Sequence, residues 1–237
     1  MDGGLAEYLV VEAKNAKRVP QELSLEIAGM YRCCQTNFYV TETAGVALVE
    51  PLAVGWHAVR MNLPDQCHSA LVVGAGPIGL AIVQALKVRG VKDIIVADTN
   101  PAKQKYAFTA GAHHFINSLE EDVIEFCTRT AHASAGVQIA FDTAGKQTTL
   151  DQCVGSVCIG GTIVNVAIWG GSASFLPNVF ALGEKGYVGS AVYIDRDFDE
   201  VIASITSGKA IRSCQSNAMA QLTPHCRHYQ SGLYDNV

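Results

Sequence analysis

Long apolar runs and charged residues are both scarce in this sequence. No apolar run reaches the roughly 18 residues that a membrane helix needs, because three glycines and a proline interrupt the longest candidate, residues 71–83. Only 16% of the 237 residues are charged and 49% are hydrophobic, whereas disordered chains combine high charge with low hydrophobicity. The composition therefore excludes disorder over the whole chain and predicts a protein without a membrane span.

Clusters of basic residues are missing as well. Lys and Arg number 17 against 22 Asp and Glu, which gives a formal net charge of −5. Nucleic-acid-binding proteins neutralise phosphates with clustered Lys and Arg, so nucleic acid is not expected as the main partner. The first residues show neither the basic nor the apolar segment of a secretory signal. We therefore expect a cytoplasmic protein whose eight cysteines are reduced thiols.

Cysteine and histidine pairs with zinc-ligand spacing are also scarce. Zinc sites usually take Cys and His in pairs separated by about two to four residues. Cys33 and Cys34 are adjacent, and Cys153 and Cys158 lie too far apart. Near the end of the sequence, suitable residue types occur at unsuitable spacing in Cys214, His225, Cys226 and His228. The spacing favours an irregular C-terminal stretch over a zinc site.

What the sequence does contain is a regular alternation of strand-like and helix-like segments. Short apolar runs predict strands at residues 70–73, 93–97, 115–116, 136–141, 162–167 and 186–192. Helical spacing of apolar residues predicts helices at residues 46–60, 80–89, 101–110, 120–131, 146–154 and 198–207. Strands that alternate with helices of about ten residues are typical of a parallel sheet covered on both faces. The fold class is therefore α/β, with a doubly wound parallel sheet.

A glycine-rich loop at residues 74–79 joins the first of these strands to the next helix. Gly74 permits the tight turn, Gly76 lets a pyrophosphate approach the backbone, and Gly79 lets the helix pack on the strand. The helix dipole and free N–H groups then face the phosphates. Asp98, nineteen residues after Gly79, would accept hydrogen bonds from the adenosine ribose. The pattern indicates a Rossmann-type dinucleotide site; the alternative is another doubly wound protein, such as an S-adenosylmethionine-dependent methyltransferase.

The acid also indicates which dinucleotide is preferred. A carboxylate at Asp98 repels a 2′-phosphate, and no arginine follows it directly. We therefore expect NAD rather than NADP.

Segments beyond this loop carry a family resemblance. These are Gly-Gly-Leu-Ala-Glu-Tyr at residues 3–8, Ala-Leu-Val-Glu-Pro-Leu-Ala-Val-Gly-Trp-His-Ala at 47–58, the dinucleotide-binding segment 69–145, Val-Asn-Val-Ala-Ile-Trp at 164–169, and Gly-Ser-Ala at 189–191. With them the sequence resembles the zinc-containing medium-chain dehydrogenase/reductase family, in its polyol and butanediol dehydrogenase branch. The Glu-Pro-Leu element is quite specific to that branch, whereas the Rossmann segment is shared more widely.

The resemblance implies NAD-dependent interconversion of a secondary alcohol, such as 2,3-butanediol or sorbitol, and its ketone. In that family a catalytic zinc polarises the oxygen and favours hydride transfer. By position, the pyrophosphate would be held by Gly74, Gly76, Pro77, Ile78 and Gly79, and the ribose by Asp98 and Lys103. The nicotinamide half would be flanked by Thr143, Ala144, Val166, Ala167 and Ile168. Glu50 matches a carboxylate that ligates or supports the zinc.

The resemblance also implies how the chain is divided. Residues 1–59 are expected to be a remnant of a GroES-like β catalytic domain, with an irregular insert at 29–45. Residues 60–195 form the NAD-binding Rossmann domain, 196–212 a closing helix and 213–237 an irregular tail. The family's other zinc ligands would precede the first residue, so we expect an N-terminally truncated chain. The family also pairs its nucleotide-binding domains through the edge strand, here near 186–192, which implies a homo-oligomer.

Two other functions stay open. One is a non-catalytic NAD-binding fragment of such an enzyme; the other is a zinc-independent reductase of the same superfamily, which usually prefers NADP and is disfavoured by Asp98. Short-chain dehydrogenases are disfavoured because Tyr187 has no lysine four residues on. His57 is expected to be a packed, hydrogen-bonded residue, and His113 and His114 are expected in a loop.

Overall fold

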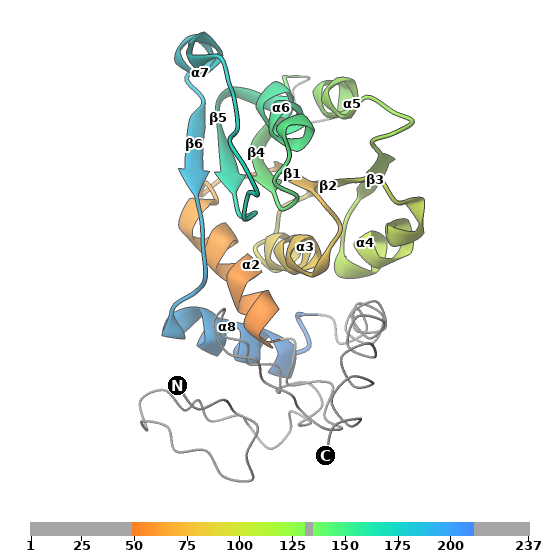
Figure 1. The fold of residues 1–237 in the computed structure, drawn as a ribbon. Helices are drawn as coiled ribbons and strands as arrows, with labels where there is room; N and C mark the ends of the chain where they lie inside the picture. Colours follow the sequence, from red (N-terminus) through yellow and green to blue (C-terminus); the bar gives the residue numbers. More distant parts are fainter. Residues whose placement is uncertain (1–48, 131–134, 211–237) are drawn as a thin grey trace, which may run out of the picture.

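The fold is a six-stranded parallel sheet with helices on both faces (Figure 1). The computed structural model describes residues 49–130 and 135–210. The strands are β1 (Ser69–Val73), β2 (Asp93–Asp98), β3 (His114–Asn117), β4 (Val137–Asp142), β5 (Val157–Asn165) and β6 (Gly186–Gly189), in the spatial order β3-β2-β1-β4-β5-β6. All five neighbouring pairs are parallel. The doubly wound α/β fold expected from the alternation is confirmed.

The helices connect these strands and cover the sheet. They are α2 (Val49–Asn62), α3 (Pro77–Val88), η3 (Pro101–Lys103), α4 (Gln104–Ala110), α5 (Val123–Thr130), α6 (Gln147–Ser156), α7 (Pro177–Gly183) and α8 (Asp195–Thr206). One face carries α3 and α4, with α2 packed on α3 and α8 packed on α2, and the other face carries α5 and α6 (Figure 1). No helix in the described ranges combines the length and hydropathy of a membrane span.

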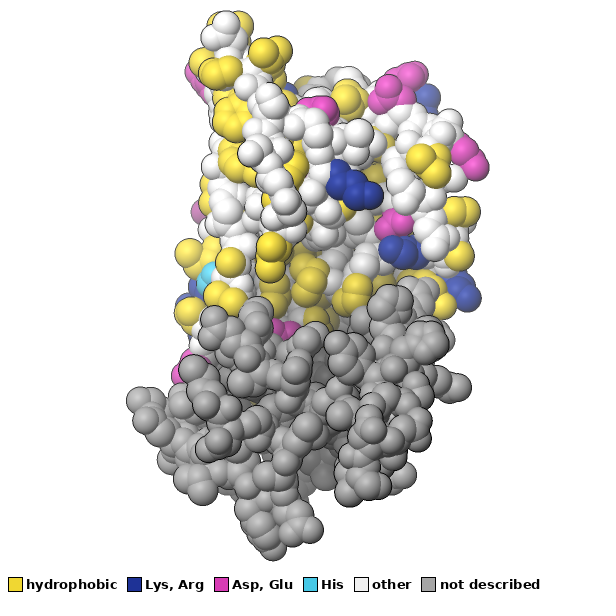
Figure 2. All heavy atoms as spheres, viewed as in Figure 1, with side chains coloured by type: hydrophobic (Ala, Val, Ile, Leu, Met, Phe, Trp, Pro, Cys, Tyr) yellow, Lys and Arg dark blue, Asp and Glu magenta, His cyan; other side chains and the backbone are white. Residues whose placement is uncertain are grey.

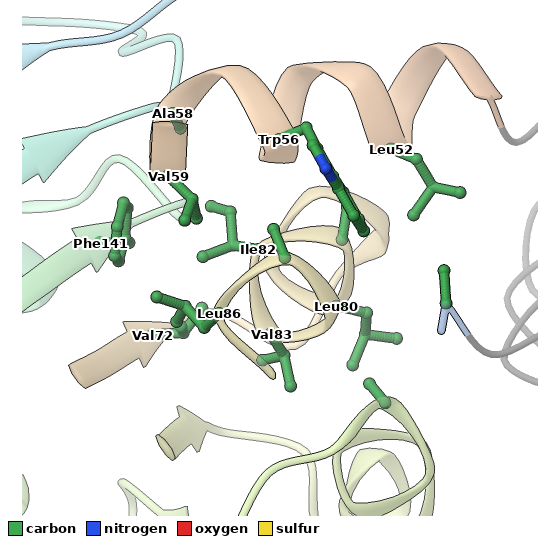
Figure 3. Close-up of a cluster of buried hydrophobic side chains, with 14 of the residues drawn as sticks. Leu52, Trp56, Ala58, Val59, Val72, Leu80, Ile82, Val83, Leu86 and Phe141 are labelled. Carbon is green, nitrogen blue, oxygen red and sulfur yellow. The ribbon is translucent and has the colours of Figure 1, made fainter. Parts of the chain in front are cut away.

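The larger half of the core lies between the sheet and the helices α2, α3 and α8. Leu52 and Trp56 of α2 lie over α3, where they meet residues such as Leu80 (Figure 3). A Cβ on Gly55 would lie 2.7 Å from the Cβ of Ala81, so the close approach of α2 to α3 depends on that glycine. Each large side chain buried in this way stabilises the fold by about 1.5–3 kcal/mol.

A second core fills the opposite face, under α5 and α6. Leu71, Ile95 and Ile163 point to this side, whereas their strand neighbours Val72 and Val164 belong to the first core. Because successive strand residues point to opposite faces, a strand that is buried on both faces must be apolar throughout. That is why these strands read as continuous apolar runs rather than as alternating ones.

A buried ionic cluster joins α2 to the start of α8. The Asp197 side chain is fully buried; its Oδ1 accepts a hydrogen bond from Arg60 Nε at 2.6 Å. Its Oδ2 accepts from His57 Nδ1 at 2.7 Å and from the Ile194 N–H at 2.8 Å. Burial opposes ionisation, but the hydrogen bonds from Arg60, Ile194 and His57 outweigh it and lower the pKa of Asp197. The expectation that His57 is a packed, hydrogen-bonded residue is confirmed.

Several predicted boundaries differ from the observed ones. Helix α7 was not predicted at all, β5 begins at Val157 rather than 162, and β6 ends at Gly189 rather than 192. Helices α3 and α8 begin three residues before the predicted starts, and α5 begins three residues after, because Asp122 accepts the N–H groups of Ile124 and Glu125. The loop expected at His113 and His114 is wrong for His114, which opens β3.

Two of the expected domain limits fall within helices. The limit at 59/60 falls inside α2, and that at 195/196 falls at the first residue of α8. Both helices contribute to the core that contains α3. The predicted insert at 29–45 and tail at 213–237 lie outside the described residues.

Candidate functional site

The candidate site lies at the carboxyl ends of β1 and β4, where the strand order reverses. Ligands of doubly wound proteins bind at this position because the connections from the two strands diverge to opposite faces there. The loop at residues 74–79 leaves β1, and Thr143 follows β4. Thr143 joins the two: its backbone N–H and its Oγ1 both donate to the Val73 carbonyl, at 3.0 and 2.8 Å.

The glycine loop has the tight geometry that its sequence predicts. Gly74 has a φ of +102°, and a Cβ on it would lie 2.5 Å from Thr143 Oγ1. A Cβ on Gly79 would lie only 1.8 Å from the Gly74 carbonyl oxygen. Gly76 differs, because a Cβ there would have nothing within 4 Å. The backbone at Gly76 therefore faces open space.

Helix α3 starts directly at this open space. Pro77 occupies its first turn, and the preceding Gly76 provides no side-chain cap. The first N–H groups of a helix have no partner within the helix, and they carry the positive end of the helix dipole. This end of α3 can therefore receive an anion such as a pyrophosphate.

Asp98 lies beside the loop at the end of β2 and is 9% exposed. Its Oδ2 accepts hydrogen bonds from the Ala75 N–H at 2.7 Å and from Lys103 Nζ at 3.2 Å. Its Oδ1 accepts from the Asn100 N–H at 2.9 Å. These contacts hold the carboxylate against the glycine loop, and they bring Lys103 to the same place.

The turn after β4 depends on Asp142, which sequence reasoning missed. Its Oδ1 accepts from the N–H groups of Ala144 and Gly145, at 2.9 and 3.1 Å. Its backbone carbonyl accepts from Val166 and Ala167, at 2.9 and 3.1 Å. Asp142 is 1% exposed, and its Oδ2 is buried without a hydrogen-bond partner among the described residues. The available signal was an acid at the end of an apolar strand.

The structure therefore places the predicted residues on adjoining segments of one edge. The glycine loop contacts Thr143 and Asp98, Asp98 contacts Lys103, and the turn containing Ala144 contacts the segment 166–168. Ile168 is 95% exposed. Their roles in binding stay predictions.

Glu50, a predicted residue, and Tyr187, weighed above only against short-chain dehydrogenases, lie on other elements. Glu50 is in the first turn of α2. Within 49–130 and 135–210 no three His, Cys, Asp or Glu side chains are grouped as metal ligands, so these residues do not fit a zinc site and the role of Glu50 stays a prediction. Tyr187 lies in β6; partial burial and the nearby Asp142 raise its pKa, so its phenol stays protonated at neutral pH.

Comparison with known proteins agrees with this architecture. The profile of the family described as zinc-binding dehydrogenase matches residues 77–207. The (R,R)-butanediol dehydrogenase of Saccharomyces cerevisiae is 33% identical over 218 residues, which cover 91% of this chain and 52% of that protein. The chain spans about half the length of the curated relatives it matches.

Solved structures of dehydrogenases superpose on this chain. The crystal structure of 2R,3R-butanediol dehydrogenase from Bacillus subtilis superposes with a TM-score of 0.68 at 31% identity, covering 83% of this chain and 50% of that one. A structure from Escherichia coli CFT073, described as a short chain alcohol dehydrogenase complexed with NADH, superposes with a TM-score of 0.72 at 25% identity. It covers 90% of this chain and 57% of the other.

Proposed function

The chain belongs to the zinc-binding dehydrogenase family, and from this we propose that it binds NAD for the interconversion of a secondary alcohol, in particular a vicinal diol or polyol, and its ketone. The observation that carries the proposal is the open space at Gly76, which lies at the uncapped start of α3. When bound, NAD supplies the hydride acceptor for the alcohol carbon.

Each part of the edge has a distinct role in this proposal. The N–H groups at the start of α3 receive the pyrophosphate, and the absence of a side chain at Gly76 lets it approach them. Asp98 accepts hydrogen bonds from the adenosine ribose hydroxyls, and Lys103 donates to the same ribose. Thr143, Ala144 and the backbone of residues 166–168 flank the nicotinamide half.

The substrate side of the reaction rests on the family. Because the described residues do not group three metal ligands, we derive no step through zinc from them. The alternative is that this chain binds NAD without turning over a substrate. Incubation with NAD and 2,3-butanediol or sorbitol distinguishes the two, because absorbance of NADH rises only if the chain completes the reaction.

Asp98→Asn is expected to weaken NADH binding about tenfold, or about 1.4 kcal/mol. The amide has one acceptor oxygen where the carboxylate has two, and it no longer repels a 2′-phosphate. Preference for NADH over NADPH should therefore narrow, as measured by calorimetric titration with both cofactors. Asp122→Asn, at an exposed helix start where either residue caps well, is the matched control. If wild type does not bind NADH, or Asp98→Asn binds it unchanged, the cofactor assignment is wrong.

We also propose that the chain forms a homodimer through β6. This strand lies at the sheet edge, and apolar side chains gather over β6, α7 and the segment before α7 (Figure 2), namely Phe175, Leu176, Val179, Leu182, Tyr187 and Val188. Phe175 and Phe180 lie edge to face, with ring centres 4.9 Å apart. An edge strand offers unpaired N–H and C=O groups to a second chain, and exposed apolar patches mark interaction surfaces.

In analytical ultracentrifugation, wild type should have twice the chain mass of 25.2 kDa, and Val188→Lys should have the mass of a single chain. The reason is that a charge at the sheet edge opposes strand pairing. We expect the dimer dissociation constant to rise at least about tenfold, or about 1.4 kcal/mol. Leu119→Lys is the control, since Leu119 is exposed and follows β3 at the opposite edge. A monomeric wild type, or a dimer that Val188→Lys leaves intact, contradicts the proposal.

A further inference from the structure

The Gln147 side chain holds the segment 166–176 after β5 close to its far end, at Ser174. The Gln147 Nε2 donates to the Ser174 carbonyl at 2.7 Å, and its Oε1 accepts from the Ser174 N–H at 2.9 Å. Nε2 also donates to Asp151 Oδ1 at 2.8 Å. These three contacts fix the orientation of the amide, because a flipped amide would direct oxygen toward two acceptors and nitrogen toward a donor.

The near end of this segment is attached by a different set of contacts. Trp169 Nε1 donates to Asn165 Oδ1 at 2.9 Å, and Asn165 Nδ2 donates to the Ala167 carbonyl at 3.2 Å. Gly145 lies directly against this end: a Cβ on it would be 2.9 Å from the Ala167 Cβ and 3.5 Å from the Trp169 ring. The near end therefore packs on the turn after β4, and Gln147 begins the helix that follows the same turn.

Hydrogen bonds, rather than apolar burial, determine where residues 170–174 lie. All five are exposed, so few packing contacts would return them to the same position after a fluctuation. At Ser174 the Gln147 amide bonds to the backbone N–H and carbonyl, and so it fixes the course of the chain there. Removing it leaves the near end attached and Phe175 packed on Phe180, but it releases the backbone of Ser174 between them.

We propose that Gln147 is a positioning residue for the nicotinamide half of the cofactor. It acts by holding the segment 166–176 across the carboxyl edge of β4 and β5, and it touches no reacting atom. The inference rests on the proposed function, since it concerns the part of the site that flanks the nicotinamide. If the segment is less often in the position that binds the nicotinamide, the apparent affinity for NADH falls in proportion to the population of that position.

The test compares two ligands that share every group except the nicotinamide. Gln147→Met keeps the length of the side chain and removes both hydrogen bonds to Ser174. We expect NADH to bind about fivefold more weakly, whereas ADP-ribose binds within about twofold of wild type, since one pair of neutral hydrogen bonds is lost. Thr148→Ala, an exposed neighbour on the same helix, is the matched control and should change neither affinity.

The protein contains its own reporter for this test. It has two tryptophans: Trp56 is buried at 2% exposure, whereas Trp169 lies in the segment itself. At saturating NADH, energy transfer from tryptophan to bound NADH should fall in Trp169→Phe, which identifies the source of the signal. Calorimetry gives the ADP-ribose affinity.

The outcomes separate the inference from the proposed function. If wild type binds neither ligand, the cofactor assignment fails and the role of Gln147 fails with it. If wild type binds both, and Gln147→Met either binds NADH as wild type does or loses both ligands equally, only the positioning role is overturned. A selective loss of NADH affinity, with unchanged thermal unfolding, supports it.

Discussion

Replacing Asp197 with alanine is expected to lower the free energy of unfolding by about 3–5 kcal/mol. The substitution leaves Arg60 and His57 facing each other without the carboxylate that accepts from both, and removing one member of a buried ion pair leaves an uncompensated charge. Arg60 Nη2 lies 3.3 Å from His57 Nδ1. The contact between α2 and α8 should weaken first.

Urea denaturation followed by circular dichroism measures this loss. The matched control is Glu200→Ala on the same helix, whose carboxylate pairs at the surface with Arg89 and Arg196. Surface pairs contribute about 0–1 kcal/mol, so this variant should stay close to wild type. If both variants lost the same free energy of unfolding, the buried cluster would not stabilise the fold more than a surface ion pair does.

The same cluster predicts how stability depends on pH. The folded-state pKa of Asp197 is lowered from its usual 3.8, because the hydrogen bonds from Arg60, Ile194 and His57 outweigh the cost of burial. A carboxylate with a lowered pKa contributes stability that is fully present well above pH 3.8 and is lost as the pH falls through the folded-state value. The stability difference between wild type and Asp197→Ala should therefore shrink below about pH 4.

The local pattern of apolar residues was enough to predict the strands at the centre of the sheet. Residues 70–73 and 93–97 are buried on both faces, so nearly every side chain carries the signal. Helix α7 has only seven residues, none of them buried, so it is too short for a helical spacing of apolar residues to be recognised. The early start of β5 was missed because Gly160, with a φ of +73°, interrupts the strand's register against β4.

Some residues of the candidate site were likewise predictable from the sequence, and others were not. Gly74, Gly79 and Asp98 were predictable because the chemistry of each depends on residues close by in the chain or at fixed spacing. Gln147 was not predictable, because Ser174 lies 27 residues away from it. Outside the site the same holds for Asp197, whose partners His57 and Arg60 lie 140 and 137 residues away. The local sequence around a polar side chain does not indicate a hydrogen-bond partner that is distant in the chain.

Gly79→Ala is expected to reduce NADH affinity by at least about thirtyfold, or about 2 kcal/mol. The new Cβ would lie 1.8 Å from the Gly74 carbonyl oxygen and 3.2 Å from Thr143 Oγ1. Because the nearest atom belongs to the backbone, the glycine loop or the start of α3 must move. Hydrogen bonds to charged groups contribute about 1.5–3 kcal/mol each, so displacing even one pyrophosphate contact accounts for the loss. Overpacking of this kind should also lower stability by about 1–3 kcal/mol.

Gly76→Ala separates the loss of binding from the loss of stability. Its Cβ meets nothing within 4 Å, so thermal unfolding of the free protein should match wild type. The methyl group would nevertheless occupy the space through which a pyrophosphate reaches the backbone, and NADH titration should show weakened binding. If Gly76→Ala binds NADH like wild type, the cofactor does not sit against this loop. If Gly79→Ala keeps both its stability and its affinity, the close approach of α3 to β1 does not build the site. Weak binding in both variants, with instability in Gly79→Ala alone, is the result that the geometry requires.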